Sequence, residues 1–342
     1  MMKKAVIYVF SGTGNTRLVA GLYKNYLSEY ETSVVDVNLA ALNGLRRAAE
    51  SGGAECSVPH PAEFDLIGFG YPVHGFNAPK IMVDFARLLP AAGGKDAFIF
   101  KTSGEGLSFN NYSSQKLIQI LERKGFSFLC ERHYVMPYNM IFRHTPEMVK
   151  SEYIYADAMV RLNAREIADG IRESVHTNPL KAWFVPIVRI EWLYAQLQGP
   201  AMRVDMKKCV RCNKCVRGCP LENISFDGTK FRFGTNCALC VKCSFNCPTR
   251  AISIGLLNGW RINGSYKIKE TAANPDVAFP YFGGNLRGLK RWLYYGYYRR
   301  CDEKLSAAGI ELRVPALPNA SSGRTEPLGA ESAAGVQDGG TC

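Results

Sequence analysis

Residues 5–16 read AVIYVFSGTGNT and decide how the chain begins to fold. The apolar, β-branched run Ala5–Phe10 predicts a buried strand. It ends in the glycine- and hydroxyl-rich turn Ser11–Thr16, after which a helical pattern continues to Tyr30. A strand that passes through such a turn directly into a helix is typical of a parallel sheet covered by helices. The apolar run is too short to be the core of a secretory signal peptide, so we expect a cytoplasmic protein.

The same alternation continues through the first 140 residues. Short β-rich runs lie at Ala5–Phe10, Ser33–Val37, Asp65–Gly70, Ala97–Thr102 and Phe128–Val135, and helical patterns lie near Thr16–Tyr30, Pro79–Leu89 and Ser113–Lys124. We predict an α/β fold with a flavodoxin-like, doubly wound, five-stranded parallel sheet. In such sheets the ligand site lies at the carboxyl ends of the strands.

The first loop offers Ser11, Gly12, Thr13, Gly14, Asn15 and Thr16. It is not a Walker A loop, because no Lys follows Gly14, and Arg17 stands where a GxGxxG motif has its last glycine. Hydroxyls and free backbone N–H groups at a helix N-terminus suit a phosphate monoester. The loop resembles the flavodoxin phosphate loop [ST]-x-T-G-x-T, which implies FMN. The alternative is a turn that uses Gly, Ser and Thr only to turn and cap the helix.

Two later loops follow the third and fourth predicted strands. The flavodoxin resemblance implies that they flank the isoalloxazine ring of FMN, with Tyr71, His74 or Phe76 stacked on the ring and backbone amides at its polar edge. The candidate residues in these loops are Tyr71, Pro72, His74, Asn77, Ser103 and Gly104. The alternative is that His74 is an exposed loop residue and Phe76 a core residue.

Eight of the twelve cysteines form a duplicated motif. CVRCNKCVRGCP at 209–220 repeats as CALCVKCSFNCP at 237–248, with every Cys and Pro shifted by 28 positions. Three thiolates three residues apart let a tight loop wrap three corners of a cubane cluster. Cytosolic thiols serve metals or redox chemistry more often than disulfides.

The motif resembles the C-x2-C-x2-C-x3-C-P pattern of bacterial two-cluster ferredoxins, in which the fourth cysteine ligates the other cluster. The resemblance implies two 4Fe-4S clusters. One would be held by Cys209, Cys212, Cys215 and Cys247, and the other by Cys237, Cys240, Cys243 and Cys219. Zinc sites, disulfides and clusters with a purely structural role are the alternatives.

The combination resembles the flavodoxin-ferredoxin fusion family, often called EFR-type ferredoxins, over roughly residues 3–256. We divide the chain into an FMN-binding domain (1–150), a helical linker (151–202), a two-cluster ferredoxin domain (203–256), an aromatic and basic extension (257–310) and a disordered tail (311–342). The resemblance implies an electron-transfer protein that works between a donor and an acceptor protein. The alternative is a flavin-dependent oxidoreductase that reduces a small substrate over FMN with electrons from the clusters.

The net charge of +12 lies in and just after the cysteine region. Leu286–Leu305 combines Trp292 and four tyrosines with arginine and lysine. We expect either packing of these aromatics on the ferredoxin domain or linker helix, or a docking surface for an acidic redox partner or an anionic membrane. Nucleic-acid binding is a third, less favoured reading of the charge. Ala182–Leu197 carries Arg189 and Glu191, so we expect a packed amphipathic helix and no membrane span.

Overall fold

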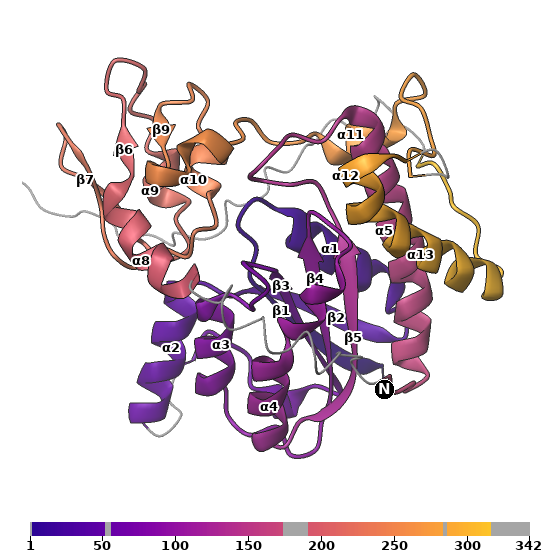
Figure 1. The fold of residues 1–342 in the computed structure, drawn as a ribbon. Helices are drawn as coiled ribbons and strands as arrows, with labels where there is room; N and C mark the ends of the chain where they lie inside the picture. Colours follow the sequence, from indigo (N-terminus) through magenta and orange to yellow (C-terminus); the bar gives the residue numbers. More distant parts are fainter. Residues whose placement is uncertain (1, 52–55, 174–190, 283–285, 316–342) are drawn as a thin grey trace, which may run out of the picture.

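The computed structural model describes residues 2–51, 56–173, 191–282 and 286–315. Its centre is a five-stranded parallel sheet in the order β2-β1-β3-β4-β5 (Figure 1). The strands are β1 (Lys3–Val9), β2 (Tyr30–Asp36), β3 (Leu66–Pro72), β4 (Asp96–Ser103) and β5 (Ser127–Val135). The predicted flavodoxin-like α/β fold is confirmed in this part of the chain, with strand ends that differ from the predicted ones by up to three residues.

Strand β1 shows why the sheet needs helices on both faces. Ala5, Ile7 and Val9 face one hydrophobic core, whereas Val6 and Tyr8 face another, because successive side chains of a strand point to opposite sides. Helices α2 (Leu39–Glu50), α3 (Lys80–Leu88) and α4 (Gln115–Arg123) cover one face, and α1 (Asn15–Tyr26) and α5 (Pro146–Ala168) cover the other (Figure 1).

Helix α5 differs from the predicted helical linker. It begins at Pro146 after the N-cap Thr145, whose side chain accepts a hydrogen bond from the Met148 amide. It packs on α1 and β5 and so belongs to the core of the sheet rather than to a linker that starts at residue 151. Most of the second half of the expected linker, residues 174–190, lies outside the described residues, and α8 (Glu191–Ala201) follows it.

The cysteine module, residues 203–256, repeats one small unit. Its elements are β6 (Arg203–Val204), α9 (Lys214–Arg217), β7 (Ile224–Phe226), β8 (Phe231–Phe233), α10 (Lys242–Phe245) and β9 (Ile252–Ser253), and η3 (Gly255–Trp260) leads out of the module. The shift of 28 residues relates α9 to α10. Two antiparallel ladders, β6 with β9 and β7 with β8, close the module at its two ends. The repeat in the sequence is therefore also a repeat in the backbone.

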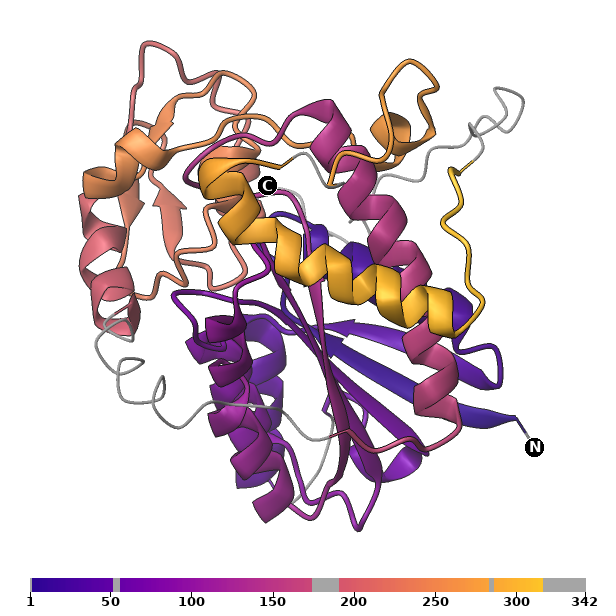
Figure 2. The same ribbon diagram turned by 45° about the vertical axis from the view of Figure 1, so that its right-hand side comes forward.

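After the cysteine module the chain returns to the sheet. The returning elements are α11 (Ile268–Ala273), α12 (Gly288–Lys290), η4 (Arg291–Tyr295) and α13 (Gly296–Ala307). Helix α13 lies across α5 in Figure 2 and buries Tyr297, Tyr298 and Leu305 in the core on that face. The aromatics of Leu286–Leu305 thus pack largely on the flavodoxin-like domain and on the helix that the sequence assigned to a linker, not on the cysteine module.

No helix in the described part of the chain is long and apolar enough to cross a membrane. The beginning of the expected amphipathic helix Ala182–Leu197 and nearly all of the expected tail lie outside the described residues.

Candidate functional site

A pocket of about 610 Å³ opens at the carboxyl ends of the parallel strands. This is within the range of small-molecule sites, roughly 300–1,000 Å³. Among the residues expected at a ligand, those that line it are Ser11, Gly12, Thr13, Asn15, Thr16, Pro72, His74, Ser103 and Gly104. The pocket therefore lies where a doubly wound sheet places its ligand.

The first loop forms one end of the pocket. Gly14 takes a left-handed conformation, φ 109°, and is the N-cap of α1. Such a φ is open to glycine without strain. The first amides of α1 have no partner within the helix and point toward the loop. Thr16 is buried and its hydroxyl lies 2.8 Å from the Thr102 hydroxyl, so this side chain bridges β4 and the loop.

The first loop contains no carboxylate and no free basic side chain in the described structure. Arg17 pairs with Asp36 on the surface. Asn15 donates its side-chain amide to the Pro137 carbonyl at 2.8 Å, and Asn139 donates to the Thr13 hydroxyl at 3.4 Å. The neutral hydroxyls and helix amides here suit an anion that brings its own charge.

Three expected contact residues lie elsewhere. Tyr71 is fully buried beneath the pocket with its hydroxyl 3.1 Å from the Ser113 hydroxyl. It sits inside β3, which continues to Pro72 rather than ending at Gly70, so it cannot stack on a ligand. Asn77 is buried and shapes its loop through paired backbone bonds with His74. Gly14 serves the turn and does not line the pocket.

His74 remains at the pocket. It is half-buried and its ring lies 6.3 Å from that of Phe10. Burial lowers the pKa of His74 to about 4, against a weaker raising effect from a hydrogen bond with the Ala238 backbone. The imidazole is therefore neutral at neutral pH and joins the pocket to the cysteine module.

Several pocket residues were not predicted from the sequence. The clearest group is an acidic network on the pocket wall, in which Glu105 accepts hydrogen bonds from the Tyr138 hydroxyl and, at 3.1 Å, from the Asn110 amide. Three further wall residues come from the cysteine module and the segment after it, namely Leu239, Leu257 and Trp260. Only the fold brings these segments to the strand ends, so no local motif marks them.

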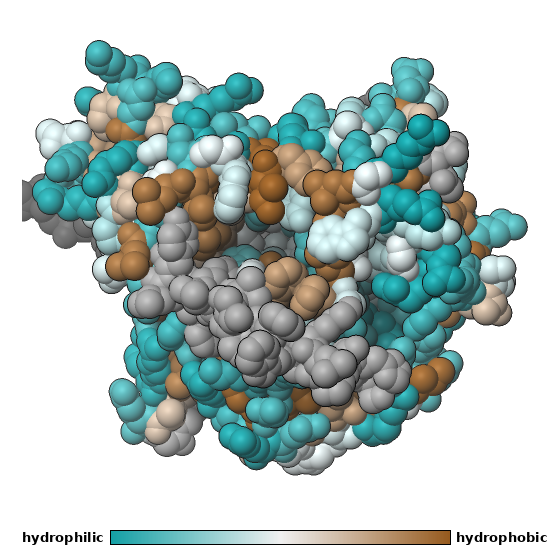
Figure 3. Space-filling view, viewed as in Figure 1, coloured by the Kyte–Doolittle hydropathy of each residue, from teal (hydrophilic) through white to brown (hydrophobic). Residues whose placement is uncertain are grey.

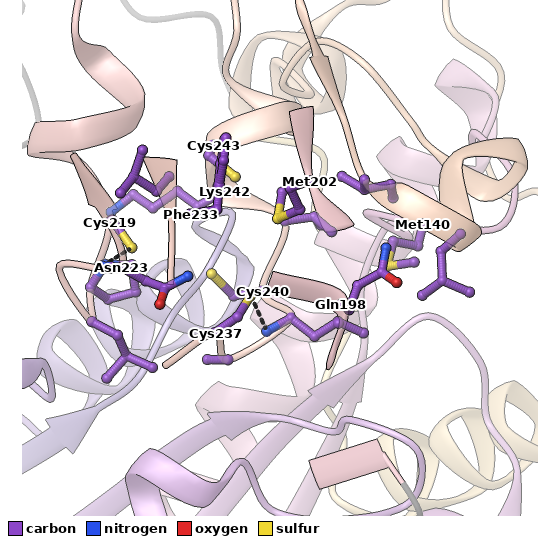
Figure 4. A pocket seen from close by; sticks show the side chains of 18 residues that line it. Met140, Gln198, Met202, Cys219, Asn223, Phe233, Cys237, Cys240, Lys242 and Cys243 are labelled. Carbon is purple, nitrogen blue, oxygen red and sulfur yellow. Dashed lines mark hydrogen bonds between the residues drawn. The ribbon is translucent and has the colours of Figure 1, made fainter. Parts of the chain in front are cut away.

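The eight motif cysteines fall around two separate cavities. Cys219, Cys237, Cys240 and Cys243 line one of them, and Figure 4 shows their side chains around a common space. The other is lined by Cys209, Cys212, Cys215 and Cys247, and Cys243 lines it as well. We call these groups the inner set and the outer set. In each set, three cysteines come from one half of the repeat and the fourth from the other half.

The backbone around both sets has the geometry of an anion-binding nest. Arg211, Asn213 and Glu222 have positive φ values of 53°, 55° and 50°. The residues 28 positions later, Leu239, Val241 and Arg250, have φ values of 52°, 49° and 55°. Left-handed backbone costs a non-glycine residue free energy. Alternation of such residues with right-handed ones turns successive amides toward one concave surface that favours negative charge.

Amide hydrogen bonds to sulfur follow the same repeat. Arg211 N donates to Cys209 Sγ at 3.4 Å, and Leu239 N donates to Cys237 Sγ at 3.4 Å. For the fourth cysteines, Asn223 N donates to Cys219 Sγ and Ala251 N to Cys247 Sγ, both at 3.3 Å. These amides stabilise sulfur that carries negative charge.

Within the described residues, no group of three His, Cys, Asp or Glu side chains could hold a single metal ion. No disulfide links any of the cysteines that the structure describes. Burial raises the pKa of the Cys240 thiol to about 12, and it also raises the pKa of Cys237 and Cys243. Buried thiols arranged around a space, rather than around a point, fit a multi-atom cluster better than a zinc ion.

The pocket and the inner set share a wall. Met140, Leu239 and Leu257 line both. A Cβ added to Gly12 would lie 2.7 Å from the Cβ and 2.8 Å from the carbonyl oxygen of Cys240. The first loop is thus in direct contact with an inner-set cysteine.

Comparisons with known proteins add little to this picture. No family model matches the chain, and no curated protein matches it. Among solved structures, the chain is similar to a putative flavoprotein from Bacteroides uniformis, with 21% identity, 39% of this chain and 90% of that chain covered, and a TM-score of 0.29. A flavodoxin from Streptococcus pneumoniae TIGR4 is 16% identical over 49% of this chain and 99% of its own, with a TM-score of 0.34.

A flavoprotein from Lactobacillus acidophilus in complex with FMN is 15% identical over 38% of this chain and 93% of its own, with a TM-score of 0.28. Identities and TM-scores this low assign no cofactor and no role to this chain.

Proposed function

We propose that this chain is an electron-transfer protein that binds FMN in the pocket at the strand ends and two 4Fe-4S clusters on the inner and outer cysteine sets. FMN supplies chemistry with one or two electrons, and each cluster supplies single-electron chemistry; the protein supplies position and electrostatics. The observation that carries the proposal is the contact between Gly12 and Cys240, because it puts the first loop against a cysteine of the inner set.

The pocket residues fit FMN. The amides at the start of α1, with the hydroxyls of Ser11 and Thr13, would hold the 5′-phosphate. His74, Gly104 and Tyr138 line the part of the pocket beyond the loop and would face the ring. Because the His74 imidazole is neutral, it adds no positive charge that would draw the phosphate away from the first loop.

The cysteine sets fit cubane clusters. Cross-membership of Cys219 and Cys247 requires the two halves of the repeat to fold together, so the two clusters would stabilise one unit. Shared lining orders the three sites as pocket, inner set and outer set, since Lys242 and Cys243 line the cavities of both sets. Electrons would then pass between FMN and the outer cluster by way of the inner cluster.

The test is the composition of anaerobically reconstituted protein. We expect about eight irons and eight sulfides per chain, the content of two cubanes, and one FMN. Cys219→Ala should damage the cluster held by Cys237, Cys240 and Cys243, although in sequence Cys219 follows the first three cysteines of the outer set. Electron paramagnetic resonance of the reduced variant distinguishes the two clusters, and loss of the outer-set cluster instead would refute the assignment. Zinc in place of iron would refute the cluster proposal itself.

The second candidate is a flavin-dependent oxidoreductase acting on a small substrate. It is favoured by the Glu105–Tyr138 network, which offers exchangeable protons inside an open pocket. Two results together would favour this function over that of a carrier. The holoprotein would turn over small oxidants at steady state, and Tyr138→Phe would lose this turnover while it keeps one-electron exchange with proteins.

A further inference from the structure

The surface around the outer cysteine set is strongly basic. We call Lys207, Lys208, Arg211, Lys214, Arg217 and Arg250 the basic face. All six are exposed. Lys208 has an acidic partner, Asp205, at 3.5 Å. In the part of the chain that the structure describes, none of the other five forms an ion pair. Figure 3 shows hydrophilic residues gathered over this part of the molecule, at the upper left, above β6 and α9 of Figure 1.

Exposed apolar side chains lie within the basic face. Val210 is 62% and Met206 37% exposed, and both are within three residues of Cys209. An apolar centre with a charged rim is the usual composition of a transient protein interface. Both apolar residues flank the first cysteine of the outer set rather than the pocket.

The two cysteine sets differ in where they face. The inner set adjoins the flavodoxin-like domain, where Leu221 and Cys240 join the core that α2 and α3 cover. Leu39 N donates to the Pro220 carbonyl at 2.8 Å and fixes this contact. The outer set instead lies beneath the basic face, and Lys214 lines its cavity. A partner protein can approach the outer set more closely than the inner set.

We propose that the basic face docks an acidic redox protein, and that electrons pass between this partner and the cluster of the outer set. The proposal rests on the proposed function. In each encounter the outer cluster loses one electron as the partner's one-electron centre gains one, or the reverse, and no covalent bond changes. Charge complementarity would steer the encounter and would weaken as salt is added.

The test compares two triple variants of the holoprotein that change net charge equally. The docking variant is Lys207→Glu/Lys208→Glu/Arg211→Glu. The control is Lys24→Glu/Arg46→Glu/Arg123→Glu, three exposed residues on α1, α2 and α4. Iron, sulfide and FMN contents are measured first. A wild-type protein without clusters would mean that the proposed function has failed, whereas normal contents in all three proteins leave docking as the only question.

Electron exchange is then followed by stopped flow with two protein probes, an acidic plant-type ferredoxin and the basic cytochrome c. At low ionic strength the docking variant should exchange with the ferredoxin about 10-fold or more slowly than wild type. It should exchange faster with cytochrome c. High salt should remove both differences, and the control variant should resemble wild type throughout.

Two results would overturn the proposal. One is equal slowing in the docking and control variants, which would show an effect of net charge alone. The other is salt-dependent binding of duplex DNA by wild type that the docking variant loses while exchange with the ferredoxin stays at the wild-type rate. In that case the basic face would bind nucleic acid.

Discussion

Replacement of Gly12 by alanine is the sharpest test of the contact between the first loop and the inner cysteine set. The added Cβ would meet the Cβ and carbonyl oxygen of Cys240 at 2.7 and 2.8 Å. Both atoms belong to a buried residue whose backbone is held by the cysteine loop, so neither can swing away as a flexible side chain could. The loop and the cysteine module must therefore move apart.

The cost should be that of overpacking a tight contact, about 1–3 kcal/mol. If the first loop takes up this strain, FMN should bind about 5- to 160-fold more weakly. If the cysteine loop takes it up, the inner cluster should become labile while the outer one stays. Both readouts come from one sample, by flavin fluorescence titration and by electron paramagnetic resonance after reduction.

Gly21→Ala provides the matched control. Gly21 lies in α1, and an added Cβ there meets no atom within 4 Å. This variant should be neutral or more stable than wild type by about 0.5–1 kcal/mol, because alanine favours a helix more than glycine does. Unchanged FMN affinity and two intact clusters in Gly12→Ala would show that the loop and Cys240 are not in contact, and the proposed electron path would lose its support.

Three further predictions concern the pocket, the returning segment and pH. Ser11→Ala with Thr13→Ala should weaken FMN binding, with each charge-assisted hydrogen bond worth about 1.5–3 kcal/mol, while riboflavin affinity stays nearly unchanged; equal losses in calorimetric titrations would place the phosphate elsewhere. A chain that ends at Phe282 should lose cooperative thermal unfolding of the flavodoxin-like domain, because it lacks Tyr294, Tyr297 and Tyr298 of the core; an unchanged melting curve would contradict this packing. Burial, together with the positive charges of Lys101 and Arg300, holds the pKa of His133 well below its usual range. Below about pH 6.5 the unfolded state therefore binds a proton that the folded state does not bind. The free energy of unfolding should fall there as pH drops, by at most about 1.4 kcal/mol per pH unit. His133→Gln should flatten the acid side of the urea-unfolding profile, and identical wild-type and variant profiles would exclude this histidine as the cause.

The sequence was most informative where a site is built from one continuous stretch. The first loop and its helix were predicted because strand, glycine turn and helix follow one another within residues 5–26. Tyr71 was misplaced for an equally local reason, since β3 runs two residues further than expected and keeps this side chain in the core. An error of two residues in a strand end moves a side chain from a loop into a sheet.

The wall of the pocket could not be predicted in the same way. Glu105, Tyr138 and Trp260 come from three segments and meet only because β4, β5 and the cysteine module end at the same edge. The helical linker was predicted to begin at residue 151, but α5 begins at Pro146. The prediction missed this start because α5 buries polar residues such as Lys150 and Glu152 together with apolar ones. Burial around most of a helix removes the apolar periodicity on which the prediction rests.

The segment that follows the cysteine module explains how the pocket stays next to the inner set. Domains in one chain move relative to each other unless their interface is extensive. Here the segment after the module is tied to the loop that follows β5. Ile141 N donates to the Trp260 carbonyl at 2.8 Å, and Arg143 donates to the Gly264 carbonyl at 2.8 Å.

The same connection extends to the far side of the sheet. Lys150 of α5 donates to the carbonyls of Asn274 and Val277 at 2.7 and 2.9 Å. Gly106, at the pocket edge, donates its amide to the Leu293 carbonyl at 2.9 Å. The chain thus leaves the sheet, forms the cysteine module and returns to pack on the same domain. The Leu39–Pro220 hydrogen bond and the contacts of the segment that follows the module hold the module against the same domain. Electron transfer between FMN and the inner cluster would require such a fixed separation.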